Sequence, residues 1–75
     1  MGDTKEKILL TALQLFARDG YEAVSVRNIA EELGITKGAL YRHYKNKRDI
    51  FDSIVDRMIQ IDAQRAKEYL MTFEQ

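Results

Sequence analysis

The sequence of 75 residues contains no cysteine and no proline, and it has a single histidine, His43. Without cysteine there is neither a disulfide framework nor a thiolate metal site, and such a composition fits a reducing compartment such as the cytoplasm. With only one histidine in addition, we expect no metal site. The absence of proline, together with many strong helix formers, favours an all-α chain.

Long apolar runs are also missing. No stretch approaches the roughly 18 consecutive apolar residues that a membrane span needs. The polar start at residues 1–7 predicts no secretory signal. We therefore expect no contact with a membrane and a cytoplasmic location. The chain is long enough for one small domain, whose single core is only marginally stabilising.

Net charge is absent as well, because twelve Lys and Arg balance twelve Asp and Glu. This balance argues weakly against a non-specific nucleic-acid binder. The distribution is uneven, however. Residues 1–24 carry a net charge of −1, residues 25–48 carry six Lys and Arg against two Glu, and residues 49–75 carry −3. The positive charge therefore gathers in the middle of the chain, where it predicts a phosphate-binding face.

Residues 25–47 follow the pattern of a DNA-binding helix-turn-helix. A helix is predicted at 26–33 and a second helix at about 37–43, with a tight turn between them. Gly34 can take the positive φ that this turn demands. The small side chain of Ala30 lets the two helices approach closely. In such a motif the second helix enters the major groove.

The flanking segments are predicted to brace this pair. Apolar residues at helical spacing predict a first helix at about 4–18, with Asp3 and Glu6 as a capping box and Gly20 as a left-handed cap. A fourth helix is predicted from about 47 to at least 70. We therefore expect an all-α fold, with a homeodomain-like three-helix core and a long fourth helix.

The fourth helix is too long to bury its whole apolar stripe on three short helices. Such an overhang usually means that something else packs there. We expect a DNA-binding head at residues 1–48 and a linking helix at 47–75 that leads into a further domain. The side chains expected beyond the core are Ile61, Tyr69, Leu70 and Phe73.

Groups at the starts of two predicted helices, the one at 26–33 and the one from about 47, suit DNA phosphates. The Ser25 hydroxyl and the free N–H groups of the first turn can bind a phosphate, and Arg27 can reach a second phosphate or a base edge. The alternative is an ordinary cap beside a solvated arginine. Lys47 puts an ammonium at the start of the fourth helix, which also suits a phosphate.

The second helix of the motif offers a polar outer face. With Leu40 directed inward, a turn of 100° per residue directs Arg42 straight outward, where its fork matches guanine O6 and N7. Gly38 is a poor helix residue, which indicates that a backbone or a phosphate comes close. For His43 a structural role is an open alternative. The outward set is Lys37, Gly38, Tyr41, Arg42 and His43.

Several short motifs occur in order between Lys7 and Phe51: ILxxAxxLF at 8–16, GY at 20–21, VRNIA at 26–30, LGI at 33–35, KGALY at 37–41, HY at 43–44 and KNK at 45–47. In this order and spacing they resemble the N-terminal DNA-binding domain of TetR-type bacterial transcriptional regulators. The resemblance implies a ligand-responsive regulator, most often a repressor, that binds a palindromic operator in double-stranded DNA. It implies a homodimer formed through a domain absent here, which also binds a small-molecule inducer; no cofactor is expected.

The resemblance also assigns contacts by position. It implies base or groove contacts from Arg27, Thr36, Lys37, Gly38, Ala39, Arg42 and His43. It implies phosphate contacts from Ser25, Tyr41, Tyr44 and Lys47. By helical position the ring of Tyr44 is expected to be part-buried, with its hydroxyl in water.

Two other classes of function compete with this interpretation. A small helical module that binds protein through its tyrosine-rich helix is the alternative, but the charge of residues 25–48 favours DNA. We expect no enzyme, because the sequence has no nucleophile–base pair, no metal cluster and no phosphate-binding glycine loop.

Overall fold

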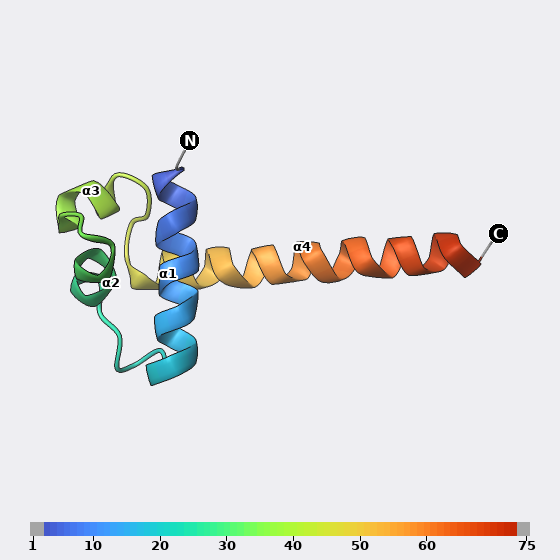
Figure 1. Cartoon of the computed structure of the whole chain (residues 1–75), viewed down its shortest axis with the longest axis horizontal. Coiled ribbons are helices and arrows are strands. Elements are labelled where there is room, and N and C mark those ends of the chain that lie inside the picture. The colour runs from blue at the N-terminus through green and yellow to red at the C-terminus, as the bar shows by residue number, and fades with distance from the viewer. Residues whose placement is uncertain (1–2, 74–75) are drawn as a thin grey trace.

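The computed structural model describes residues 3–73, and over this range the chain forms helices and loops without a strand. The helices are α1 (Thr4–Asp19), α2 (Val26–Leu33), α3 (Lys37–Tyr41) and α4 (Lys47–Phe73). α2 and α3 lie to one side of α1, and α4 starts against α1 and then runs far out of the bundle (Figure 1). The predicted all-α helix-turn-helix fold with a long fourth helix is confirmed.

Residues that flank α1 cap both of its ends, Asp3 at the start and Gly20 at the end. The helix begins where the Asp3 carboxylate accepts a hydrogen bond of 3.1 Å from the N–H of Lys5. The predicted reciprocal cap is not formed, because the Glu6 carboxylate instead accepts two hydrogen bonds of 2.7 Å from Arg57 of α4. Gly20 ends the helix with a φ of 89°, but its ψ of 153° lies outside the left-handed helical region that was predicted.

α2 occupies its predicted range because both of its ends carry strong local signals. The Ser25 hydroxyl accepts the N–H of Asn28 at 3.1 Å, while the Asn28 side-chain oxygen accepts the N–H of Ser25 at 2.9 Å. This is a reciprocal capping box. At the other end Gly34 adopts the left-handed helical conformation, with φ 71° and ψ 30°. The N–H of Ile35 then returns to the carbonyl of Ala30 at 3.0 Å, which closes the turn.

α3 ends at Tyr41, two residues earlier than predicted. Thr36 caps its start by accepting the N–H of Ala39 at 3.0 Å. At its end the N–H groups of Arg42 and His43 donate to carbonyls three residues back, which is a tighter turn than an α-helix. The chain therefore keeps winding through His43 although the regular helix has ended.

The core takes one large, fully buried side chain from each helix. These side chains are Ile8, Ile29, Leu40 and Ile50. Each such burial stabilises the fold by about 1.5–3 kcal/mol. Because Leu40 holds the inner face of α3 against the bundle, the opposite face of α3 remains at the surface.

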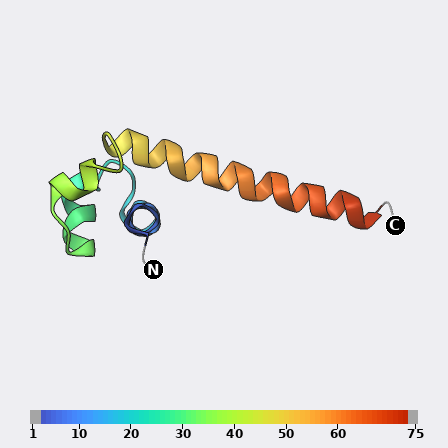
Figure 2. The same cartoon turned by 90° about the horizontal axis from the view of Figure 1, so that it is seen from above.

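Only the beginning of α4 packs on the other helices. Ile54 is buried, but every later described side chain is exposed. With 27 residues α4 is about 40 Å long, and most of this length projects as a free rod (Figure 2). The rod exposes large apolar side chains, including the predicted Ile61, Tyr69 and Leu70. The side chain of Phe73 lies outside the described residues.

Candidate nucleic-acid interface

An open hollow of about 380 Å³ lies where the starts of α2 and α4 meet α3. Its lining holds three cationic side chains and one carboxylate, and we call it the basic hollow. The surplus of positive charge suits a polyanion. The hollow brings five of the predicted contact residues to one surface: Ser25, Arg27, Lys37, Tyr41 and Lys47.

The N-terminus of α2 presents unused hydrogen-bond donors at this surface. The Ser25 hydroxyl accepts the N–H of Asn28, and the Ser25 carbonyl accepts the N–H of Ile29. The N–H groups of Val26 and Arg27 have no partner within residues 3–73. The Ser25 hydroxyl accepts one hydrogen bond and keeps its own proton for donation. Together with the helix dipole, these donors suit a phosphate oxygen.

The Arg27 side chain extends from the first turn of α2 into solvent. It is 75 % exposed and forms an ion pair of 3.5 Å with Glu31, one turn further along the same helix. A pair that is this exposed contributes little to stability. The guanidinium therefore remains available to an external anion or a base edge.

The outer face of α3 carries the other predicted groove residues. Thr36, Lys37, Gly38, Arg42 and His43 are exposed, and Ala39 is half-buried. Within the described part of the chain, the side chains of Lys37, Arg42 and His43 form no hydrogen bond or ion pair. The face is therefore polar and charged, and its cationic and histidine side chains have no partner within residues 3–73.

Gly38 is not required by the fold. Positive φ among the described glycines is confined to Gly20 and Gly34, so the backbone at position 38 does not itself require glycine. A Cβ built on Gly38 meets only the Thr36 hydroxyl at 3.9 Å, an ordinary contact. A glycine inside a helix costs about 0.5–1 kcal/mol relative to alanine. The fold itself therefore gives no reason for a glycine at position 38.

Lys47 lies at the edge of the basic hollow, but its ammonium is already engaged. It donates to the carbonyl of Tyr21 at 2.7 Å and to that of Val24 at 2.9 Å. It also lies 4.1 Å from the centre of the Tyr21 ring. An ammonium has three N–H donors, so one is left for an external phosphate.

Tyr44 lies apart from the other candidate residues. Its side chain is only 4 % exposed, which is deeper than the partial burial that was expected. Its hydroxyl donates to the carbonyl of Lys5 in α1 at 3.3 Å. Burial raises the pKa of the Tyr44 hydroxyl, and the nearby Glu6 adds to this effect. In this structure Tyr44 holds α1 and does not line the basic hollow.

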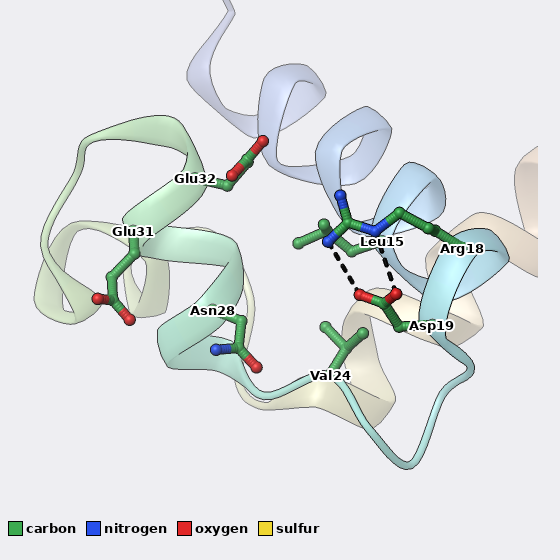
Figure 3. Close-up of a pocket in the computed structure, with 7 residues that line it drawn as sticks. All are labelled: Leu15, Arg18, Asp19, Val24, Asn28, Glu31 and Glu32. Atoms are coloured by element: carbon green, nitrogen blue, oxygen red, sulfur yellow. Dashed lines mark hydrogen bonds and ion pairs between the residues drawn. The ribbon is translucent and has the colours of Figure 1, made fainter.

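A second hollow, of about 360 Å³, lies between the end of α1 and α2 and is acidic (Figure 3). Its carboxylates are Asp19, Glu31 and Glu32, against the single guanidinium of Arg18. Arg18 donates two hydrogen bonds to Asp19 and thereby lowers the pKa of that carboxyl. The three carboxylates point in different directions, and among the described residues no group is placed to hold a metal ion. The negative surplus disfavours phosphate on this side of α2.

Two residues that build the interface were not singled out from the sequence. Asn28 completes the capping box of Ser25, and its position three residues later was the available signal. Tyr21 supplies both a ring and a carbonyl to Lys47 across 26 positions of sequence. Such a distant pairing has no local signature.

Comparison with known proteins yields a consistent group. Residues 8–54 match the family model described as bacterial regulatory proteins, tetR family. The chain is similar to the uncharacterized HTH-type transcriptional regulator YerO of Bacillus subtilis, with 37 % identity over 67 residues, 89 % of this chain and 23 % of YerO. It is also similar to the tetracycline repressor protein class C of Escherichia coli, with 40 % identity over 58 residues, 77 % of this chain and 26 % of that protein.

A solved structure agrees with these matches. The crystal structure of a transcriptional regulator of the TetR/AcrR family from Thermobifida fusca has a TM-score of 0.81 and 34 % identity to this chain. The match covers 85 % of this chain and 35 % of that one. The chain thus spans between about a quarter and about a third of the length of these similar proteins.

Proposed function

Because this chain belongs to the tetR family of bacterial regulatory proteins, we propose that it binds duplex DNA sequence-specifically, with α3 in the major groove. The observation that carries this proposal is the outer face of α3. It combines unpaired polar side chains with Gly38, a glycine that the fold itself does not require. A close external surface explains both features.

In the proposed complex the side chains on and beside α3 read the groove. The exposed Arg42 follows α3 directly, and in this proposal its planar fork reaches base edges, where guanine O6 and N7 are its best partners. Gly38 leaves room for the DNA at the centre of the contact. The full set of proposed groove contacts is Arg27, Thr36, Lys37, Gly38, Ala39, Arg42 and His43.

Phosphate contacts fix the position of α3 in this proposal. The donors at the N-terminus of α2 bind one phosphate through Ser25 and the first N–H groups. The Tyr41 hydroxyl, on the side chain that is 45 % exposed at the basic hollow, binds another. Lys47 has one N–H left for a weaker contact with the same backbone. Tyr44 is omitted from the set because its hydroxyl is bonded to α1.

The longer proteins similar to this chain suggest the wider context. We propose that the domain acts as the DNA-binding part of a ligand-responsive repressor in the cytoplasm. In this proposal a further domain dimerises the protein on a palindromic operator and binds a small-molecule inducer. The exposed apolar side chains on the rod of α4 support such a domain, because an uncovered stripe of this kind usually packs against another surface.

The proposal is tested by selecting duplexes from a random pool and then measuring the affinity of variants for the selected site. Arg42→Ala should cost about 1–3 kcal/mol of binding free energy and relax the preference at one base position. Arg65→Ala is the matched control, because it removes the same charge from the exposed rod. Equal effects of the two variants, or binding that is indifferent to sequence and salt, would refute the assignment.

A further inference from the structure

The connector between α1 and α2, residues 20–25, is held by the first residue of α4. The Lys47 ammonium donates to the carbonyls of Tyr21 and Val24 at 2.7 Å and 2.9 Å. These two carbonyls lie on either side of the bend, and the N–H of Val24 also approaches the Tyr21 carbonyl at 3.4 Å. One cation therefore closes the connector into a loop and ties it to the start of α4.

The same cation holds the Tyr21 ring. Lys47 lies 4.1 Å above the ring centre, an attractive position for an ammonium. On its other contacts the ring packs against Phe16 of α1 and Phe51 of α4, with centroid distances of 5.3 Å and 5.1 Å. The connector is thus anchored through both its backbone and its largest side chain.

The segment that Lys47 anchors ends at Val24. In the proposed function the next residue, Ser25, binds a phosphate. Val24, whose carbonyl Lys47 holds, is directly followed by Ser25, the cap of α2. The Val24 side chain is itself buried in the core. Ser25 therefore has little freedom to shift relative to α4 while the Lys47 contacts persist.

We infer that Lys47 is a positioning residue, which supports DNA binding mainly by holding the α1–α2 connector so that Ser25 and the α2 N-terminus meet their phosphate. The inference rests on the proposed function. This positioning role differs from a direct contact, in which the Lys47 ammonium itself would bind a phosphate independently of Ser25. The two roles predict different couplings between Lys47 and Ser25.

A double-mutant cycle on the 75-residue chain separates these roles. Lys47→Met removes both hydrogen bonds but keeps an unbranched chain beside Tyr21. It should weaken binding to a selected duplex about tenfold, the effect of losing one charge-assisted hydrogen bond. In a Ser25→Ala background the same change should cost less than about twofold, because the contact it supports is already gone.

Lys45→Met is the matched control, because the exposed Lys45 side chain forms no hydrogen bond or ion pair within the described residues. It should have the same small effect in both backgrounds. A tenfold loss from Lys47→Met in both backgrounds, with the salt slope reduced by about one, would assign Lys47 to direct phosphate binding and overturn the inference. If Lys47→Met does not fold, Lys47→Gln replaces it in the same cycle with the same expected outcomes.

Amide hydrogen exchange tests the positioning role of Lys47 without DNA. In Lys47→Met the amides of Ser25 and Asn28, which form the capping box, should lose protection, while amides in the middle of α1 keep theirs. Unchanged protection of the capping box would overturn the inference. A wild-type chain that binds no duplex would instead refute the proposed function, and the exchange result would still decide whether Lys47 positions α2.

Discussion

Replacing Gly38 by alanine should make the protein more stable and its DNA complex weaker. In the free chain the new methyl group meets only the Thr36 hydroxyl, at 3.9 Å, and the backbone at position 38 suits alanine. Alanine is favoured over glycine in a helix by about 0.5–1 kcal/mol. For a domain of this size, that gain corresponds to a rise in Tm of about 2–8 °C.

The same methyl group points to the surface that we propose contacts the groove. Closely packed contacts tolerate extra atoms poorly, and the cost of one additional methyl is about 1–3 kcal/mol. Gly38→Ala should therefore lower the affinity for a selected duplex by at least about fivefold. Thermal unfolding followed by circular dichroism gives the stability, and fluorescence anisotropy with a labelled duplex gives the affinity.

Gly34→Ala is the control for this pair of measurements. Space is available at Gly34 as well, but its φ of 71° strains any other residue. This variant should lower Tm, by contrast with Gly38→Ala. The reasoning about Gly38 is refuted if Gly38→Ala lowers Tm, or if it raises Tm and leaves the affinity for DNA unchanged.

Three further outcomes are expected. Tyr44→Phe should reduce the free energy of unfolding by about 0.5–1.5 kcal/mol, because the hydrogen bond to the Lys5 carbonyl is lost. It should leave the affinity for DNA unchanged. A specific loss of affinity would mean that the Tyr44 hydroxyl does contact a phosphate. Arg57 lowers the pKa of Glu6, so the pair stabilises the fold above the ordinary pKa of 4.5, and this contribution is lost as the pH falls below that value. Comparing the Tm of wild type and Glu6→Gln at pH 7 and pH 3 checks this, since the difference should shrink at pH 3. The 75-residue chain should sediment mainly as a monomer in dilute solution and bind a half-site weakly, so a stable dimer on a full palindrome would contradict the proposed role of a further domain.

Features that depend on neighbouring residues were predictable from the sequence. The bounds of α2 follow from Ser25 and Gly34, whose capping chemistry acts within a few positions of the chain. The tightening at the end of α3 was not predicted, because the choice between three-residue and four-residue hydrogen bonds at Arg42 depends on how the chain turns towards α4.

The contacts that were not predicted are mainly those between residues far apart in the sequence. The charge of Lys47 and its place at a helix start were evident, but the sequence does not show that two carbonyls of the connector approach it. Glu6 was assigned to its own helix terminus, and it pairs instead with Arg57, 51 positions away. Tyr44 was expected to reach water, but the packing of α1 covers it. Each case depends on how helices cross, which local patterns do not encode.

The distribution of the core has a consequence for how this protein folds. Because each helix contributes one of the four large, fully buried side chains, no pair of helices encloses a dry interior by itself. We therefore expect the domain to unfold as a single cooperative unit, in which α3 is ordered only when the other helices are assembled. A peptide that carries only residues 25–47 lacks α1 and most of α4, and with them Ile8 and Ile50, which belong to the same buried cluster as Leu40. It should remain largely unfolded in water, so the motif cannot be grafted as an independent module.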